Sequence, residues 1–245
     1  MNNILPRPLE LGEIHLWLIS LDVAADGIPA LLGLLSVEER RRAERIRILK
    51  PRNHFIVARG LLRKILSSYL PISPEELDFD YGPHGKPELR NADSSGIHFN
   101  LSHSSNLALL AINRKYPIGV DIETARYGRS FMKLAERFFS CREIDDLHDL
   151  DEESVLAGFY ACWTRKEAYL KAIGTGLATP LNAFDVTLKP EATPALVGQR
   201  LDPAETERWS IIEIKVPAGY RAAAATQWIA PRIVFRQWQS DDQTP

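Results

Sequence analysis

The sequence contains little cysteine and no excess of charge of either sign. Its 245 residues include only Cys141 and Cys162 as cysteines, and the formal net charge is −2 at pH 7. One pair of cysteines without metal-ligand spacing argues against a disulfide framework and favours two free thiols in a reducing compartment. The nearly neutral charge gives no overall reason to expect nucleic-acid binding.

Targeting and membrane signals are also missing. The N-terminus shows no charged segment followed by an apolar stretch, so we expect no signal peptide. Apolar runs such as that over 107–112 are too short to span a bilayer. We therefore expect a cytoplasmic protein that binds neither membranes nor nucleic acid.

Several common catalytic motifs are absent. The sequence has no G-x-x-x-x-G-K-[ST] phosphate loop, no G-x-G-x-x-G dinucleotide motif, no G-x-S-x-G elbow and no H-E-x-x-H helix. The composition, 45% hydrophobic and 25% charged, is that of an ordinary globular protein.

The order of predicted elements indicates an α+β fold. We expect strands and helices to follow one another, with strands over 14–21, 77–80, 97–101, 107–113 and 118–123, and helices over 37–49 and 51–69. The chain is then predicted to be helical from about 131 to 173, and three or four strands follow between 183 and 238. Ser36 and Ser140 each stand three residues before a glutamate, a pattern that starts a helix.

The two halves of the chain show weak internal similarity. Three segments correspond in order, namely Ala43–Ile46 to Ala135–Phe138, Phe55–Leu66 to Phe159–Leu170, and Leu77–Asp80 to Asn182–Asp185. Although such similarity could arise by chance, it predicts two similar halves in a pseudo-two-fold arrangement, each a small, mostly antiparallel sheet packed with helices. We place the halves at 1–115 and 116–245 and expect a site in the crevice between them.

Two short motifs carry most of the chemical information. In one predicted strand, Asp121 and Glu123 share the face of Gly119. In one predicted helix, Glu167 and Lys171 lie one turn apart on a single stripe. If the helix crosses this face of the strand, the three carboxylates form an all-oxygen site of the kind that Mg²⁺ prefers.

Each motif alone has a simpler interpretation. Asp121 and Glu123 could form the solvent-facing side of a half-buried strand, while Glu167 and Lys171 could form a surface ion pair worth only about 0.3 kcal/mol. Three converging carboxylates, however, repel one another unless a cation is present. Their combination, with the space that Gly119 would leave beside Asp121, favours a metal site.

Polar groups in other segments are candidates for binding phosphate. Ser102 and His103 lie between two predicted strands, where side chains and free N–H groups can hold an anion, although His103 could equally be a turn histidine. Lys86 lies on a proline-containing loop. Arg59, on the second predicted helix, could bind two phosphate oxygens at once.

The segment 40–52 is rich in arginine. It could be a solvated helix face, or it could bind an acidic protein, a nucleotide phosphate or nucleic acid. Because no aromatic side chains are interleaved with the arginines, nucleic acid is the least favoured of these partners.

Four motifs are similar, in order and separation, to those of a known family. They are Gly85-Lys86-Pro87, Phe99–Ser104, Ile118–Glu123 and the W-T-x-K-E-A-x-x-K helix over Trp163–Lys171. The chain resembles the 4′-phosphopantetheinyl transferases of the longer type related to surfactin-synthetase-activating enzymes. The resemblance extends from about residue 35 to 185 and implies a monomer built as two similar halves.

The resemblance implies a Mg²⁺-dependent reaction with coenzyme A. The phosphopantetheine arm would be transferred to a serine of an apo acyl or peptidyl carrier protein, usually an acidic protein, with release of adenosine 3′,5′-bisphosphate. Asp121, Glu123 and Glu167 would hold the metal. Glu167 would also accept the serine proton, and Lys171 would bind the pyrophosphate.

The same resemblance implies contacts to the phosphates of coenzyme A from Arg59, Lys86, Ser102, His103 and Lys166. Family members vary at the position of Arg59. They also often carry lysines where segment 40–52 has arginines, so the contacts of that segment do not transfer directly.

Two other functions fit parts of the sequence. A Mg²⁺-dependent hydrolase of nucleotide diphosphates would use the same carboxylates without a carrier protein. An arginine-rich nucleic-acid-binding module would use segment 40–52 and would not need Asp121. The sequence leaves open the identity of the carrier, the tolerance for acylated coenzyme A, the number of metal ligands, and the choice between Mg²⁺ and Mn²⁺.

Overall fold

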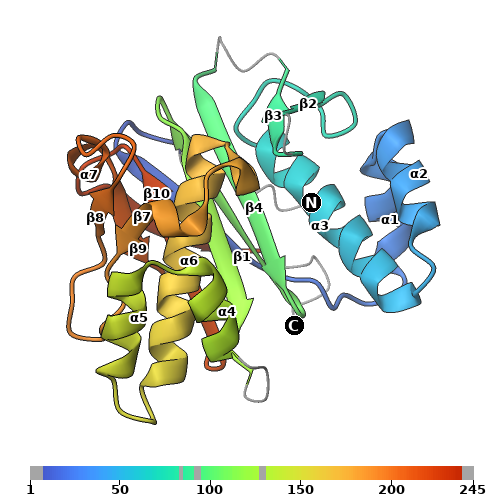
Figure 1. Ribbon diagram of the computed structural model, residues 1–245. Helices are drawn as coiled ribbons and strands as arrows, with labels where there is room; N and C mark the ends of the chain where they lie inside the picture. The colour runs from blue at the N-terminus through green and yellow to red at the C-terminus, as the bar shows by residue number, and fades with distance from the viewer. Residues whose placement is uncertain (1–7, 83–84, 91–94, 127–130, 239–245) are drawn as a thin grey trace.

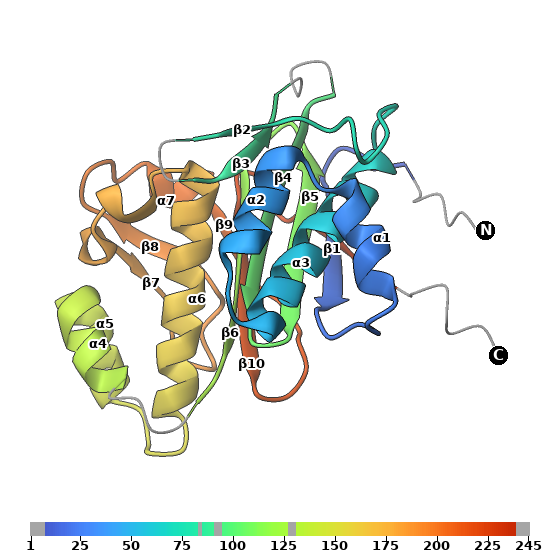
Figure 2. The same cartoon turned by 90° about the vertical axis from the view of Figure 1, so that its right-hand side faces the viewer.

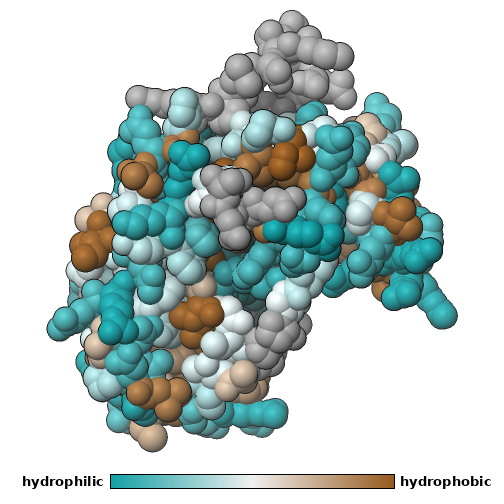
Figure 3. Space-filling view, turned by 90° about the horizontal axis from the view of Figure 1, so that it is seen from above, coloured by the Kyte–Doolittle hydropathy of each residue, from teal (hydrophilic) through white to brown (hydrophobic). Residues whose placement is uncertain are grey.

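The computed structural model describes residues 8–82, 85–90, 95–126 and 131–238, except for the side chains of Leu177 and Gln237. Two sheets lie at the centre of the molecule, and helices pack on their outer sides (Figure 1). On the face seen from above, hydrophobic side chains are scattered among hydrophilic ones (Figure 3). Within the described ranges, no helix combines the length and apolar character needed to cross a membrane.

The first sheet has four strands. In the order β11-β1-β5-β4, they are β11 (Arg232–Gln237), β1 (Glu13–Ser20), β5 (Leu107–Arg114) and β4 (Ile97–Ser104). Pairing is antiparallel except between β1 and β11, which run parallel. The helices on its outer side are α1 (Gly27–Leu34), α2 (Val37–Arg45) and α3 (Leu49–Ser67).

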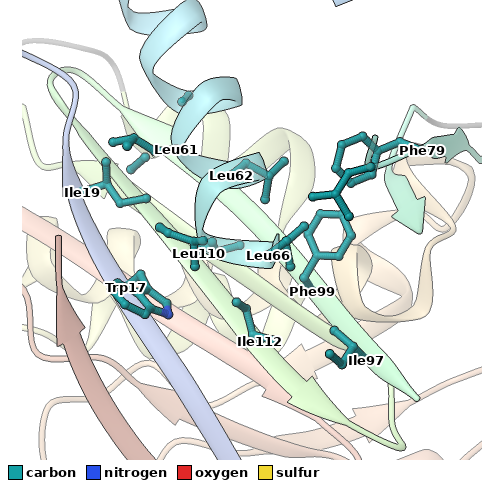
Figure 4. Close-up of a cluster of buried hydrophobic side chains, with 14 of the residues drawn as sticks. Trp17, Ile19, Leu61, Leu62, Leu66, Phe79, Ile97, Phe99, Leu110 and Ile112 are labelled. Carbon is teal, nitrogen blue, oxygen red and sulfur yellow. The ribbon is translucent and has the colours of Figure 1, made fainter. Parts of the chain in front are cut away.

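A hydrophobic core joins α3 to the first sheet. Leu61, Leu62 and Leu66 project from α3 toward the strands (Figure 4). They meet apolar side chains of β1, β4 and β5, among them Trp17, Ile19, Ile97, Phe99, Leu110 and Ile112. Because these leucines recur at helical spacing, one face of α3 is buried along its length.

The second sheet has three strands, in the order β6-β10-β9. They are β6 (Ile118–Thr124), β10 (Tyr220–Thr226) and β9 (Ser210–Glu213). Its helices are α4 (Phe131–Phe138), α5 (Cys141–His148) and α6 (Val155–Ile173). Figure 2 shows α6 on one side of the strands and α1 to α3 on the other.

The two sheets share a dry interior. Ile14, Leu16 and Leu109 of the first sheet pack against Val120 and Ile122 of the second, and all five are essentially unexposed. Along β6, apolar side chains alternate with other residues, and the apolar side chains point toward the first sheet. Its remaining side chains, including those of the D-x-E motif, therefore face α6.

Short elements complete the chain. Two small hairpins are formed by β2 (Phe79–Tyr81) with β3 (Pro87–Leu89) and by β7 (Phe184–Val186) with β8 (Leu196–Gln199). Two 3₁₀ turns, Gly176–Ala178 and Leu181–Ala183, follow α6, and α7 (Glu205–Arg208) precedes β9.

The structure confirms two similar halves. The strand order β1-β5-β4 of the first half matches β6-β10-β9 of the second, and α3 and α6 each have 19 residues. The halves also share a buried ionic arrangement. The glutamates of the two predicted capping boxes, Glu39 and Glu143, contact cations of the long helix, Arg63 at 2.7 Å and Lys166 at 2.8 Å.

Arg63 and Lys166 also donate hydrogen bonds to main-chain carbonyls in the same way. Arg63 donates to the carbonyl of Leu77 at 2.8 Å, and Lys166 donates to those of Leu181 and Phe184 at 2.6 Å each. In each half, a buried charge pair therefore ties the long helix to the segment that leads into the small hairpin. Such agreement in packing detail is what a duplication predicts.

Several expectations need correction. Besides the predicted restart at Ser140, the helical region 131–173 has a second break between α5 and α6, and α3 begins at Leu49, before Pro51, because proline fits within a first helical turn. α1, α7, β3 and β8 were not predicted. Most importantly, β11 lies in the sheet of the first half, so the division at residues 115 and 116 does not follow the hydrogen bonds of the sheets.

Candidate functional site

Gly119 brings α6 into direct contact with β6. A Cβ at this position would overlap the carbonyl oxygen of Ala168 and the amide nitrogen of Ala172, and would lie 2.9 Å from the carbonyl carbon of Lys171. We expected Gly119 to leave space for a metal ion beside Asp121. Instead, the absent side chain makes room for the backbone of α6, which places Glu167 and Lys171 over the strand that carries Asp121 and Glu123.

Asp121 and Lys171 form the centre of the site. The Lys171 ammonium lies 2.5 Å from Oδ1 of Asp121 and donates to Oγ of Ser102 at 3.1 Å. Ser102 in turn donates to the same Oδ1 at 3.0 Å. The other carboxylate oxygen, Oδ2, is buried and has no hydrogen-bond partner among the described residues. Asp121 therefore carries a free oxygen although it is only 2% exposed.

Glu123 and Glu167 are electrostatic neighbours of Asp121. Burial raises the pKa of Glu123, and the charges of Asp121 and Glu167 raise it further. Burial also raises the pKa of Glu167, with a further contribution from Asp121, while Lys171 lowers the pKa of both glutamates. Asp121, Glu123, Glu167 and Lys171 therefore influence one another's ionisation, and three carboxylates share the single ammonium of Lys171.

A divalent cation suits these residues. Among the described side chains, no three histidines, cysteines, aspartates or glutamates are already arranged around a common metal position. The free oxygen of Asp121 and the raised pKa values of Glu123 and Glu167 nevertheless indicate that the single ammonium of Lys171 does not offset the charge of the three carboxylates. All the donors are hard oxygens, which fits Mg²⁺ or Mn²⁺.

The segment with Ser102 and His103 is part of a strand. We expected it to connect two strands, but it lies within β4. Asn100, Ser102 and Ser104 occupy every second position of β4 and point toward β6. Their side chains accept hydrogen bonds from the backbone of β6, in the pairs Val120 N to Asn100 at 2.8 Å, Ile122 N to Ser102 at 3.4 Å and Thr124 N to Ser104 at 3.1 Å.

This alternation of short polar side chains explains how β4 lies beside β6 without backbone pairing between the two sheets. Sequence reasoning missed this role, although the period of two in N-x-S-x-S was visible. His103, between the two serines, has an exposed side chain. Desolvation by the surrounding protein lowers its pKa, and the charges of Lys171 and His54 lower the pKa to a smaller extent. His103 directly follows Ser102, which contacts the central lysine.

Lys86 reaches the same site from the first half. Its ammonium donates to the carbonyl of Lys171 at 2.7 Å and approaches that of Ile118 at 3.4 Å, and burial lowers its pKa. A cavity of about 220 Å³ lies here, lined by Gly85, Lys86, Pro87, Asn100, Leu101, Leu170, Lys171, Gly174 and Gly176. Pro83 and His84, from the same predicted loop, lie outside the described residues.

Two predicted phosphate contacts need correction. The guanidinium of Arg59 lies 2.6 Å from the Glu39 carboxylate and donates to the Tyr81 hydroxyl at 2.7 Å, so it is already paired within the first half. Lys166 is unexposed and bound to Glu143. Because successive helical residues turn by about 100°, Lys166 points into the interior while Glu167 faces the site.

A second cavity of about 220 Å³ lies near the other end of α6. Aromatic and apolar side chains of the helices form one side and polar side chains from β4, β6 and the segment after β6 form the other; the lining residues are Ser104, Glu123, Thr124, Arg126, Phe131, Leu134, Phe159, Tyr160 and Trp163. From Trp163 to Lys171, α6 rises by roughly 12 Å. Glu167 is midway between them on the helix, and Glu123 lines the second cavity itself.

Comparison with known proteins assigns the family. Residues 117–225 match the 4′-phosphopantetheinyl transferase superfamily, and residues 25–115 match the N-terminal region "4′-phosphopantetheinyl transferase, N-terminal". The two matches together extend over most of both halves.

Individual relatives agree. 4′-Phosphopantetheinyl transferase HetI of Nostoc sp. is 40% identical over 215 residues, which cover 86% of this chain and 87% of that protein. 4′-Phosphopantetheinyl transferase Sfp of Bacillus subtilis is 31% identical, covering 64% and 68%. A phosphopantetheinyl transferase of Thraustochytrium sp. is 29% identical, covering 83% and 76%. The chain therefore belongs to the 4′-phosphopantetheinyl transferase family and is an enzyme of that class.

Proposed function

We propose that this enzyme transfers the phosphopantetheine arm of coenzyme A to a serine of an apo acyl or peptidyl carrier protein. The observation that supports this most is the position of Glu167 on α6, midway between Trp163, which lines one cavity, and Lys171, which lines the other. One cavity is lined by Lys86 and Lys171, cations of the kind that suit a diphosphate. The other is aromatic and suits part of a protein surface. Transfer between two substrates requires two such approaches.

The proposed reaction is a substitution at phosphorus. The serine oxygen bonds to the phosphorus that bears the pantetheine arm, and the bond from this phosphorus to the bridging oxygen breaks, which releases adenosine 3′,5′-bisphosphate. Glu167 accepts the serine proton. Burial raises its pKa and makes it a stronger base than an exposed carboxylate, while Lys171 stabilises the negative charge of the departing phosphate.

Asp121, Glu123 and Glu167 would hold Mg²⁺ in this proposal. A bound divalent cation supplies charge neutralisation for the diphosphate. The contribution of the protein is orientation: β6 and α6, fixed against each other at Gly119, hold the base and the lysine beside the reacting groups. Lys86 lines the cavity that coenzyme A would enter, and Ser102 and His103 follow its lining residue Leu101 in β4.

The basic segment 40–52 is proposed to attract an acidic carrier. Arg41, Arg42 and Arg45 line an open depression of about 420 Å³ with Glu38, and these arginines form no ion pair among the described residues. A positive surface of this kind accelerates encounter with an acidic partner. Charge reversal of Arg41, Arg42 and Arg45 should therefore raise the KM for the carrier, and an unchanged KM would exclude this role.

We place the enzyme in the cytoplasm as a monomer. Both cysteines are free, which suits a reducing compartment. The site is also distinct from the basic segment, which argues against a nucleic-acid-binding module as the main function.

One experiment tests the transfer. The protein is incubated with coenzyme A, Mg²⁺ and a panel of apo carriers, and the intact carriers are weighed by mass spectrometry. We expect at least one carrier to gain one phosphopantetheine with the wild-type enzyme and none with Asp121→Ala. Cleavage of coenzyme A without any gain of carrier mass would instead identify a hydrolase.

A further inference from the structure

Ser104 carries a hydroxyl group that has no role in the proposed reaction. It is the last residue of β4, beside Glu123 and Thr124 of β6. We propose that Ser104 is a positioning residue that orients Glu123 for a divalent cation. This inference rests on the proposed function in one respect, because it takes Glu123 as a metal ligand.

The hydrogen bonds of Ser104 fix the direction of its proton. The backbone N–H of Thr124 donates to Ser104 Oγ at 3.1 Å and occupies one of its lone pairs. A hydroxyl has a single proton to donate, and the nearest acceptor is Oε2 of Glu123 at 2.9 Å. The Thr124 hydroxyl is farther from Ser104, at 3.3 Å. The serine therefore connects the backbone of β6 to the carboxylate of the preceding residue.

The same connection occurs two residues earlier in β4. Ser102 accepts hydrogen bonds from the N–H of Ile122 and from Lys171, and donates its proton to Asp121. Each serine thus accepts from β6 and holds one oxygen of a carboxylate, which leaves the other oxygen available. Because the same contact recurs two residues apart, at the period of a β-strand, the contact at Ser104 is part of a regular pattern along β4.

Without Ser104, Glu123 would be free to turn toward another side chain of its cavity. Its side chain lines the aromatic cavity together with Arg126, and an arginine is a strong competitor for a carboxylate. Hydrogen bonds that hold metal-ligating carboxylates typically contribute about 10- to 100-fold to metal affinity. Ser104 therefore affects the binding of the cation, which precedes the transfer reaction.

The test measures Mn²⁺ binding directly, by titration followed with electron paramagnetic resonance in the presence of coenzyme A. We expect Ser104→Ala to weaken the Mn²⁺ affinity by about 10- to 100-fold. Ser104→Thr keeps the hydroxyl and should stay within about threefold of wild type. Thr124→Val removes the neighbouring hydroxyl without touching the bond to Glu123, and serves as the matched control with the same expected result.

The outcomes separate the two proposals. If the wild-type enzyme binds Mn²⁺ and Ser104→Ala binds it equally well, the positioning role is wrong while the transferase remains. If the wild-type enzyme binds no Mn²⁺ and modifies no carrier, the metal assignment and the proposed function fail together. Should Ser104→Ala not fold, as judged by circular dichroism, Ser104→Cys replaces it, because a thiol has a similar shape and donates only weakly.

Discussion

The contact at Gly119 gives the sharpest prediction. In Gly119→Ala, the new Cβ would lie 2.9 Å from the Lys171 carbonyl carbon and would overlap Ala168 and Ala172 even more closely. Carbon atoms in contact prefer separations of roughly 3.5 to 4 Å. All three neighbours are backbone atoms, which cannot rotate away as a side chain would. The helix α6 must therefore move away from β6 by roughly 1 Å to restore ordinary contacts.

This displacement should reduce both stability and activity. Overpacking of this kind costs about 1 to 3 kcal/mol. A shift of about 1 Å between Glu167 on the helix and Asp121 on the strand should lower the rate of carrier modification by roughly 100-fold. Stability is measured by urea unfolding, and the rate by mass spectrometry of the carrier.

A matched glycine provides the control. Gly33 lies in α1, and a Cβ there would have no neighbour within 4 Å. Gly33→Ala should leave the rate unchanged and should raise stability by up to about 1 kcal/mol. A Gly119→Ala enzyme with wild-type stability and rate would show that α6 does not rest on β6 as described.

The remaining predictions concern single groups. Asp121→Ala and Glu167→Ala should abolish carrier modification while circular dichroism shows a folded protein. Lys166→Ala should instead destabilise the protein by about 3 to 5 kcal/mol, because it leaves a buried glutamate unpaired, whereas Lys171→Ala should abolish modification with a smaller loss in urea unfolding. Burial, with the charge of Arg236, lowers the pKa of His15 from 6.5 to about 4. The free energy of unfolding that the neutral His15 contributes is therefore fully present above pH 6.5 and is lost as the pH falls to about 4. The loss amounts to roughly 3 kcal/mol. Urea unfolding of the wild-type protein should show this loss, and urea unfolding of His15→Phe should not.

Local patterns in the sequence were sufficient to predict the central elements of the site. The alternation around Asp121 fixed which side chains of β6 face α6, and the spacing of Glu167 and Lys171 placed both on one side of the helix. The capping boxes at Ser36 and Ser140 started their helices where expected. These features depend on residues close together in the chain, which is why sequence periodicity reports them.

Features that depend on distant partners were not predictable in the same way. Lys166 and Arg59 looked like free cations, because their partners Glu143 and Glu39 come from other helices. α1 was missed because its sequence is apolar on most sides and lacks a helical stripe. The pairing of β11 with β1 depends on the topology of the whole chain. No local pattern in the sequence predicts whether a strand will join the edge of the first sheet or that of the second.

That parallel pairing has a consequence for biosynthesis. β11, the strand that completes the sheet of β1, is made about 200 residues after it, as the positions of the two strands in the chain show. Until then, one edge of β1 has unsatisfied backbone groups, although α3 and β5 can already pack. Contacts between the two ends of a chain form slowly, because a long loop must close first. The first half is therefore held incomplete during translation, and its folding is finished only when the second half has been made.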